Sequence, residues 1–377
     1  MSERTDAARQ AILAAPAESV VEALGEVLAK QYAVTDTDLL LVDYRLAALV
    51  PLLSGSPVTR AGDPAWRCFD HQSEVAGGSV IYLPVTVRGE RIGVLRCSPG
   101  PRDAELRAEL AEIATALGHE LQSASAGTDR YTMAARTQRL TLAAEMQWEL
   151  LPGRCRVRPS FGLAGQLEPS YAVRGDSFDW AERDGKVWLT VLNGMGEGMT
   201  AALLTSLATY ALRNARRAGL PLADQAALAD QAIFAQHRGR WHVSALLLEL
   251  DLATGAVGVV DAGSPLLMLL RDGEAHHQEL DAQFPLGMFE GTEYRTERIR
   301  LRPGDRLLVV SDGVSDAVGP RGRYGETALR RFARRATAMA PLEAVRSLLG
   351  DLRSYIGDAR LEDDTVAVVL DWTGPPA

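Results

Sequence analysis

The sequence predicts a two-domain α+β protein: an α/β domain over residues 1–125, a helical linker over 126–153, and a β-sandwich flanked by helices over 154–377. Three observations lead to this prediction. The length of 377 residues exceeds what one hydrophobic core usually fills. Apolar residues recur at helical spacing near the middle of the chain. Beyond Phe161, short apolar runs alternate with turn residues and a few long helical stretches.

The composition is that of a globular protein and disfavours several functional classes. Hydrophobic residues make up 47% and charged residues 24% of the chain, and the net charge of -9 disfavours broad nucleic-acid binding. The three cysteines are far apart in the sequence, which supports neither a disulfide framework nor a thiolate zinc site. The N-terminus lacks an export signal, and no apolar run approaches about 18 residues. We therefore expect a cytoplasmic protein that neither binds nucleic acid nor spans a membrane.

The first domain is predicted from a helix followed by strands. Apolar positions from about Ala8 to Lys30 have helical spacing, and Asp38–Val42 and Val80–Val87 have the character of strands. A second apolar run after Arg88-Gly89-Glu90 indicates a hairpin, and a helix is expected near Trp66. This order resembles a GAF sensor domain, although PAS-like modules share it. Its ligand is left open between a small molecule and a regulatory protein.

The helices between the domains allow two interpretations. Leu106 to Leu121 carry an apolar stripe, and Leu142 to Leu150 carry another that Leu151-Pro152-Gly153 ends. In one interpretation each stripe packs on its own domain. In the other, the helices form a homodimer and carry the state of the sensor to the second domain.

The second domain is predicted to consist mainly of paired strands. The clearest hairpin joins Val243–Leu252 to Val257–Ala262, and Arg306–Val310 and Thr365–Leu370 have the continuous apolar character of buried strands. Two long helical stretches are also expected, at Met199–Arg217 and Gly325–Leu352. Paired strands with few helices indicate a sandwich of sheets with the helices outside.

Acidic or amide residues stand beside glycine or another acid at four strand ends in this domain. The four segments are Arg174-Gly175-Asp176-Ser177, Asn193-Gly194-Met195-Gly196, Ser311-Asp312-Gly313 and Glu362-Asp363-Asp364-Thr365. Strand ends of one sheet bring distant residues together, and gathered carboxylates repel one another unless a cation is present. Oxygen ligands without a nearby histidine or cysteine favour Mg²⁺ or Mn²⁺ over Zn²⁺. Each segment alone is an ordinary turn, but together they indicate a divalent metal site.

This ordered set resembles the SpoIIE/RsbU branch of the PPM, or type 2C, protein phosphatases over about Leu142 to Trp372. The helix Leu142–Pro152 is similar to the helix that leads into the family's catalytic domain. Arg174-Gly-Asp resembles the family's Gly-Gly-Asp motif, and Asp261-Ala-Gly-Ser-Pro resembles its Asn-Ala-Gly-His-Pro segment. Ser311-Asp-Gly resembles its Asp-Gly motif, and Asp363-Asp364 resembles its closing acidic pair.

The resemblance implies a serine/threonine protein phosphatase with two Mg²⁺ or Mn²⁺ ions. It implies metal ligation by Asp176, Asn193, the Gly194 carbonyl, Asp312 and Asp363, and catalytic roles for the three aspartates. The resemblance implies that such ions would activate water for attack on phosphorus and would neutralise charge on the phosphate oxygens. The implied substrate is a phosphorylated anti-sigma-factor antagonist, and the implied process is control of transcription or stress response.

The sequence departs from the family at the metal-bridging aspartate, whose position is taken by Asn193. An amide supplies an oxygen but no negative charge, so metal affinity is expected to fall. A weak manganese-demanding enzyme, a single-metal site and a pseudophosphatase that serves as a regulatory scaffold all stay open. A further alternative makes the first domain a ligand sensor and the remainder a transmitter of dimerisation.

Three other positions depart from the family pattern: Arg174, Glu197, and Ser264 in the segment that resembles Asn-Ala-Gly-His-Pro. Arg174, where the family usually has glycine, is either a phosphate-binding side chain or a surface arginine in a turn. Glu197, where the family often has histidine, either restores charge near the site or is an exposed acid at the start of a helix.

Overall fold

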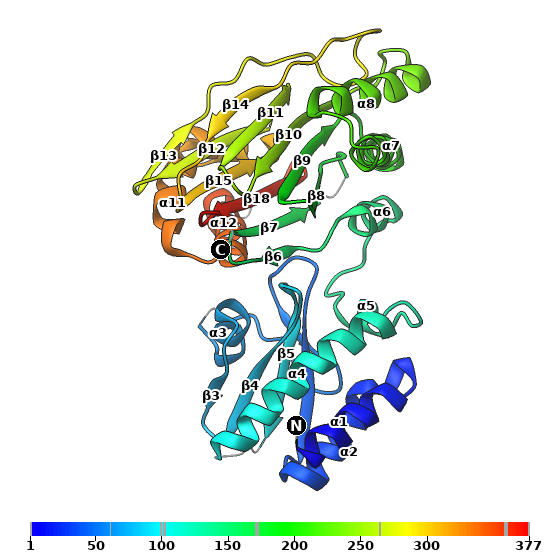
Figure 1. Cartoon of the computed structure of the whole chain (residues 1–377), viewed down its shortest axis with the longest axis vertical. Coiled ribbons are helices and arrows are strands. Elements are labelled where there is room, and N and C mark those ends of the chain that lie inside the picture. The colour runs from blue at the N-terminus through cyan, green and yellow to red at the C-terminus, as the bar shows by residue number, and fades with distance from the viewer. Residues whose placement is uncertain are drawn as a thin grey trace. The chain divides into compact units, whose positions relative to one another are not determined.

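A computed structural model describes residues 2–60, 62–98, 100, 103–169, 173–263, 265–357 and 361–375 (Figure 1). The chain divides into two compact units, Met1–Arg139 and Leu140–Ala377. Ser264, which belongs to the Asp261–Pro265 segment quoted above, lies outside the described residues. Within the described part of the chain, no helix is both long enough and apolar enough to cross a bilayer.

The residues predicted as a separate linker, 126–153, are shared between the two units. The short helix α5 (Arg130–Ala134) belongs to the first unit, where the Tyr131 hydroxyl donates a hydrogen bond to the Ala17 carbonyl at 2.5 Å. The helix α6 (Leu142–Leu150) belongs to the second unit and packs against α7 (Gly198–Arg217). Each helix therefore has its own partner within one unit.

The first unit is an antiparallel sheet of five strands with helices packed against it. The strands, in the spatial order β2-β1-β5-β4-β3, are β1 (Asp36–Val42), β2 (Leu49–Pro51), β3 (Val75–Gly77), β4 (Val80–Val87) and β5 (Glu90–Ser98). The remaining helices are α1 (Glu3–Ala14), α2 (Val20–Tyr32), α3 (Pro64–His71) and α4 (Ala104–Ala124). Helices α1, α2 and α4 share one aliphatic core with the sheet, and α3 contacts β3, β4 and β5.

Two local predictions for this unit have different outcomes. The single helix expected over Ala8–Lys30 is wrong, because α1 ends before Pro16 and α2 begins after it. Proline lacks a backbone N–H and disfavours helical geometry in the preceding residue, and Ala15 is extended, with φ -68° and ψ 147°. The hairpin at Arg88-Gly89 is confirmed. Both of its turn residues have positive φ, 51° and 95°, as a tight two-residue turn requires.

The second unit is a sandwich of two antiparallel sheets, as predicted. One sheet has the order β14-β11-β10-β9-β8 and contains β8 (Ser177–Arg183), β9 (Lys186–Gly194), β10 (Val243–Asp251), β11 (Ala256–Ala262) and β14 (Glu297–Arg300). The other has the order β13-β12-β15-β18-β7-β6 and contains β6 (Cys155–Val157), β7 (Phe161–Glu168), β12 (Leu266–Arg271), β13 (Glu274–His277), β15 (Asp305–Val310) and β18 (Thr365–Trp372). Side chains from both sheets form one aliphatic core between them.

Helices cover the outer faces of the sandwich (Figure 1). Helix α7 and helix α8 (Leu222–His237) pack on the first sheet through a second core. The other helices are α9 (Asp312–Ser315), α10 (Tyr324–Thr327), α11 (Leu329–Arg335) and α12 (Pro341–Ile356), and β16 (Val318–Gly319) pairs with β17 (Gly322–Arg323) beside them. Helix α12 contacts β7 and β18 of the second sheet.

The apolar pattern does not predict α8, and it predicts one helix over 325–352 where the structure has several. The apolar residues of α8 are mostly small alanines spread around the helix, so they do not form an obvious stripe. The stretch 325–352 is divided into α10, α11 and α12, and Pro341 occupies the start of α12, where its missing N–H needs no partner.

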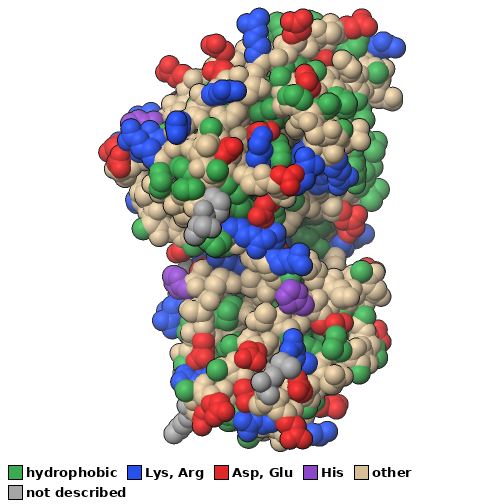
Figure 2. Space-filling model, viewed as in Figure 1, with side chains coloured by type: hydrophobic (Ala, Val, Ile, Leu, Met, Phe, Trp, Pro, Cys, Tyr) green, Lys and Arg blue, Asp and Glu red, His purple; other side chains and the backbone are tan. Residues whose placement is uncertain are grey.

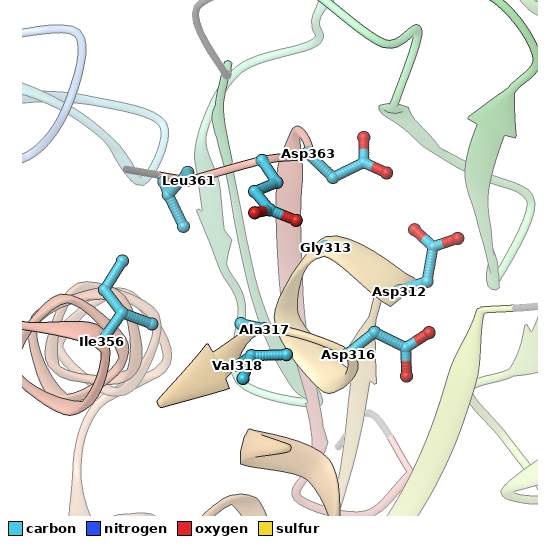
Figure 3. A pocket seen from close by; sticks show the side chains of 9 residues that line it. Asp312, Gly313, Asp316, Ala317, Val318, Ile356, Leu361 and Asp363 are labelled. Carbon is cyan, nitrogen blue, oxygen red and sulfur yellow. The ribbon is translucent and has the colours of Figure 1, made fainter. Parts of the chain in front are cut away.

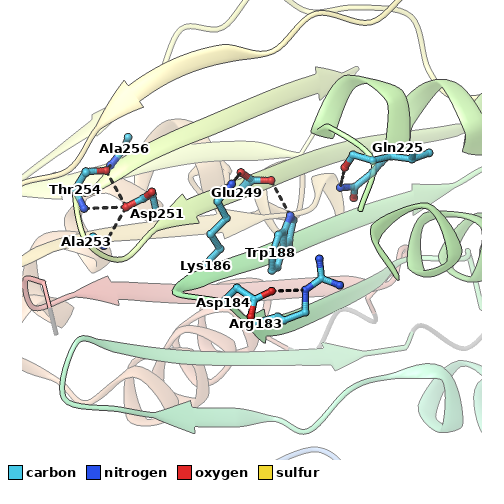
Figure 4. A network of polar contacts seen from close by, with 11 residues as sticks. Arg183, Asp184, Lys186, Trp188, Gln225, Glu249, Asp251, Ala253, Thr254 and Ala256 are labelled. Atoms are coloured by element: carbon cyan, nitrogen blue, oxygen red, sulfur yellow. Dashed lines mark hydrogen bonds and ion pairs between the residues drawn. The ribbon is translucent and has the colours of Figure 1, made fainter. Parts of the chain in front are cut away.

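The predicted hairpin of β10 and β11 is confirmed, and polar contacts hold it (Figure 4). The Asp251 carboxylate accepts hydrogen bonds from the backbone N–H groups of Ala253 and Thr254 in the turn. On the same strand, Glu249 accepts hydrogen bonds from Lys186 and from the Trp188 ring on β9. These contacts help to fix the register of β9, the strand that ends at Asn193 and Gly194. Over the visible surface of both units, acidic and basic side chains are interspersed (Figure 2).

Candidate metal centre

Asp176 lies directly before β8 at the end of a tight turn. Gly175 has a φ of +94°, which favours glycine, and its carbonyl accepts hydrogen bonds from Gly194 N at 3.2 Å and Thr205 Oγ1 at 2.5 Å. The Asp176 side chain is completely buried. Neither of its carboxylate oxygens has a hydrogen-bond partner of good geometry among the described residues. Asp176 is therefore a buried acid without a well-formed hydrogen bond at either carboxylate oxygen.

The electrostatic surroundings of Asp176 disfavour its ionised form. Burial raises the pKa of Asp176 well above its usual range, and the negative charge of Asp364 raises it further. The nearby Ser311 hydroxyl opposes this shift, whereas Asp312 and Asp363 add to it. A bound cation would offset the burial cost and the repulsion together.

Asn193 and Gly194 end β9 beside this turn. The Asn193 Nδ2 donates a hydrogen bond to Oδ2 of Asp312 at 2.5 Å. The other oxygen of Asp312, Oδ1, is buried and lacks a partner within the described ranges. A Cβ atom on Gly194 would lie 2.6 Å from Thr205 Oγ1 and 2.8 Å from the Gly175 carbonyl oxygen, so a larger residue would displace the turn.

Asp312 and Asp363 flank adjacent strands of the second sheet. Asp312 follows β15 and begins α9, and Asp363 precedes β18, which pairs with β15. Burial raises the pKa of Asp363 to about 6, and the charge of Asp312 contributes to the rise. Gly313 allows the two segments to approach, because a Cβ atom there would lie 1.8 Å from the Asp364 carbonyl oxygen.

Asp364 and Gln147 have roles in this centre that the sequence does not predict. Oδ2 of Asp364 accepts hydrogen bonds from the backbone N–H groups of Arg174 and Gly175 at 2.8 and 3.0 Å, and from Gln147 Nε2 at 3.0 Å. Asp364 thus anchors the turn that carries Asp176. The acidic pair Asp363-Asp364 is a sequence signal that includes Asp364. The pattern does not show that Asp363 is the expected metal ligand and that Asp364 anchors the turn. No local signal distinguished Gln147 from the other polar residues of its helix.

Of the further departures from the family pattern, the two that lie within the described residues, Arg174 and Glu197, are both on the surface. The Arg174 side chain is exposed, and its positive charge lowers the pKa of Asp363 in part. Glu197 is exposed at the N-terminal cap of α7 and makes no capping hydrogen bond with its side chain. Arg174 is therefore close enough to the acids to influence one of them, and Glu197 lies at a helix start.

A cleft of about 200 Å³ opens beside Asp312 and Asp363 (Figure 3). Asp316 and Glu362 contribute to its acidic part. Its apolar lining comes from Ala317, Val318, Ile356 and Leu361. The acidic centre is thus accessible from a cleft that combines carboxylates with apolar surface.

The donor chemistry of this edge fits hard divalent cations. Its side chains and carbonyls offer only oxygen ligands, which suit Mg²⁺ and Mn²⁺. Among the described residues, no three histidine, cysteine, aspartate or glutamate side chains converge closely enough to form a ready metal-binding group. Mutual repulsion keeps uncompensated carboxylates apart, and Asn193 already occupies one oxygen of Asp312. The free oxygens of Asp176 and Asp312 are the groups that a cation would satisfy.

The sequence model of the family described as Stage II sporulation protein E (SpoIIE) matches residues 183–373, which is just over half of the chain. The phosphoserine phosphatase RsbP of Bacillus subtilis (strain 168) is 26% identical over 152 residues. That similarity covers 39% of this chain and 38% of RsbP. The chain therefore matches less than two-fifths of the length of this relative.

Solved structures have the same fold in their phosphatase domains. The structure of the RsbU and RsbW domains of a Mycobacterium tuberculosis protein is 25% identical, with a TM-score of 0.51, and the match covers 60% of this chain and 63% of that one. The PP2C phosphatase domain of SpoIIE from Bacillus subtilis, solved with a fragment of its regulatory domain, is 17% identical, with a TM-score of 0.51. That match covers 58% of this chain and 65% of the other, and it supports the fold alone.

Proposed function

Because the chain belongs to the SpoIIE family, we propose that it is a metal-dependent serine/threonine phosphoprotein phosphatase. The observation that carries this proposal is the buried Asp176 carboxylate, whose two oxygens have no hydrogen-bond partner of good geometry among the described residues although burial and three other acids raise its pKa. A protein gains nothing in stability from such a group unless a cation binds it. The similarity to RsbP, a phosphoserine phosphatase, supports the same reaction.

We assign the metal-binding roles to Asp176, the Gly194 carbonyl, Asp312 and Asp363, with the Asn193 amide at the bridging position. Bound Mg²⁺ or Mn²⁺, two ions by analogy with the family, supplies activation of water and neutralisation of phosphate charge. The carboxylates orient this centre, and the exposed Arg174 side chain binds the substrate phosphate. Gly313 and Gly194 keep the backbone close enough for the acidic segments to meet.

We propose that the substrate is a phosphorylated signalling protein, such as an anti-sigma-factor antagonist. The cleft beside Asp312 accepts the chain around the phosphorylated residue, and its apolar lining contacts neighbouring side chains. The occurrence of RsbU and RsbW domains in one Mycobacterium tuberculosis protein supports a place in such a signalling system. The first unit then serves as the GAF-like regulatory input, which responds to a small ligand or to a regulatory protein.

A second candidate function is that of a pseudophosphatase, and one contact favours it. The Asn193 amide supplies no charge, and its N–H group occupies Asp312 Oδ2, an oxygen that a metal would use. A protein with this arrangement binds metal weakly and serves as a scaffold for the phosphoprotein. The two candidates share the fold and the partner and differ in turnover.

Phosphate release from a phosphorylated antagonist and from an aryl phosphate, measured with Mn²⁺, tests these candidates. Asp312→Ala removes a proposed ligand, and Asn193→Asp restores the family's charge. If the parent protein releases phosphate and Asp312→Ala abolishes this release, the phosphatase proposal is supported. A silent parent with an active Asn193→Asp variant supports the pseudophosphatase. Absence of turnover and of Mn²⁺ binding in both proteins would refute the metal-dependent proposal.

A further inference from the structure

Gln147 on α6 joins two acidic residues of the centre through one side-chain amide. Its Nε2 donates hydrogen bonds to the Asp176 backbone carbonyl at 3.1 Å and to Oδ2 of Asp364 at 3.0 Å. The side chain is 1% exposed. Both partner atoms are acceptors, so only the NH₂ group of the amide can face them. The chemistry of the partners thus determines the orientation of the amide.

We propose that Gln147 is a positioning residue, which holds the Asp176 turn and Asp364 in the arrangement that divalent metal binding requires. This inference rests on the proposed function, because it concerns the metal on which that function depends. Gln147 acts through other residues and touches neither substrate nor reacting atoms.

The hydrogen bonds act on both sides of the same turn. Oδ2 of Asp364 accepts the backbone N–H groups of Arg174 and Gly175, so it holds the segment that leads into Asp176. Gln147 orients that carboxylate and also binds the carbonyl of Asp176 itself. Loss of the amide therefore releases the turn at two points at once.

The Gln147 amide carries a cost in folding free energy that a role in packing alone does not explain. Its Oε1 is buried and has no hydrogen-bond partner in the part of the chain that the structure describes. A buried acceptor without a partner lowers stability, and an apolar side chain of similar size would avoid that cost. The two hydrogen bonds that the amide donates to the centre explain why an amide stands at this position.

Helix α6 is a firm support for such a residue. At its start, Thr141 Oγ1 accepts a hydrogen bond from Ala144 N, and at its end Arg213 donates to the Leu150 carbonyl at 2.7 Å. Ala144 also packs in a small apolar cluster with Val173, which precedes the Asp176 turn. A side chain on a helix held at both ends can fix site geometry closely.

Calorimetric titration of the full chain with Mn²⁺ alone tests the inference. Gln147→Met removes both donors at similar size, and Gln147→Asn keeps the amide but withdraws it by one methylene group. Glu149→Gln is the matched control, because Glu149 is exposed on the same helix. We expect the Kd for Mn²⁺ to rise about 10- to 100-fold in Gln147→Met, as loss of a residue that orients ligands usually causes. The Asn variant should be intermediate, and the control should match the parent.

The unfolding temperature without metal separates positioning from general stability. If both Gln147 variants unfold at a lower temperature but keep the parent's Kd for Mn²⁺, Gln147 is only structural and the inference is wrong. If the parent itself binds no Mn²⁺, the metal centre and the proposed function fail, and this inference fails with them. The two failures therefore give different results in the same titration.

Discussion

The Asn193 amide nitrogen lies 2.5 Å from Oδ2 of Asp312, so the amide presents its donor group to this carboxylate. Asn193 lies in β9 of the first sheet, Asp312 follows β15 of the second sheet, and the two are 119 positions apart in the sequence. The hydrogen bond relieves repulsion at the acidic edge, because it satisfies one carboxylate oxygen without adding charge. A metal that uses this oxygen must first displace the amide.

Replacement of Asn193 by aspartate should strengthen metal binding. Asn193→Asp adds a negative charge at the edge and removes the competing donor, so we expect the Kd for Mn²⁺ to fall by at least about tenfold. Without metal, the new pair of facing carboxylates should lower the unfolding temperature. Titration calorimetry and thermal unfolding in EDTA measure the two effects.

The control for this variant is Asn214→Asp, which makes the same change of charge at an exposed position of α7. Its Mn²⁺ affinity should equal that of the parent. An equal gain of affinity in both variants would show that net charge, and not the position of Asn193, limits metal binding.

Two buried aspartates three residues apart should respond oppositely to the same substitution. Asp176 has no hydrogen-bond partner of good geometry among the described residues, whereas Asp179 forms ion pairs with Arg213 and Arg216 at 2.8 Å. Asp176→Asn should raise the unfolding free energy of the metal-free protein, because a neutral amide replaces an acid whose charged form is disfavoured by burial and by the neighbouring carboxylates. Asp179→Asn should lower it by about 3 kcal/mol, because the buried Arg216 and the half-buried Arg213 lose their counter-charge.

Denaturant unfolding in EDTA at neutral pH measures the unfolding free energies of both variants. Mn²⁺ titration then measures how far metal stabilises each variant. Asp176→Asn should abolish metal stabilisation, and Asp179→Asn should retain it. A destabilised Asp176→Asn protein would contradict the view that this acid is kept for metal binding.

Gly313 should tolerate no side chain. A Cβ atom at this position would lie 1.8 Å from the Asp364 carbonyl oxygen, so Gly313→Ala must push apart the segments that carry Asp312 and Asp363. We expect a loss of about 2 kcal/mol in unfolding free energy and a large loss of Mn²⁺ affinity. Gly350→Ala on α12 is the matched control, because nothing lies within 4 Å of a Cβ atom there. That helical site should gain up to about 1 kcal/mol. Equal effects of the two substitutions would contradict the close approach of the two loops.

Metal-free stability should depend on the protonation of Asp363. The pKa of Asp363 is raised from 3.8 to about 6 in the folded protein, so the folded state binds more protons than the unfolded state between these values. The contribution of Asp363 to stability is therefore present below about pH 4 and is lost as the pH rises through about 6. Saturating Mn²⁺ should reverse the trend, because metal ions compete with protons for the same oxygens.

Unfolding curves of the parent and of Asp363→Asn, recorded across this pH range in EDTA, isolate the effect of this residue. The difference in stability between the two proteins should vary with pH in EDTA. A difference that stays constant from pH 4 to pH 7 would rule out a raised pKa for Asp363.

The sequence alone was sufficient for the architecture of the second unit and for the residues that gather at its edge. Local apolar patterns in the sequence predict strands such as β10, β11, β15 and β18, because each pattern lies within one short segment. Each acid lies at a strand end beside glycine or another acid, and strand ends of the two packed sheets lie at one edge of the sandwich. Helix α8 and the break at Pro16 show where the local pattern was too weak or was overlooked.

Only the tertiary structure decided which atoms face one another at that edge. The donor of Asn193 toward Asp312, and the amide of Gln147 between Asp176 and Asp364, depend on contacts across 119 and 217 positions of sequence. Such contacts leave no periodic trace, because a single side chain on a helix or strand looks the same whether it meets solvent or a distant carboxylate. The physical reason is that hydrogen-bond direction is set by the packed positions of both partners, and those positions exist only after the sheets and helices have assembled.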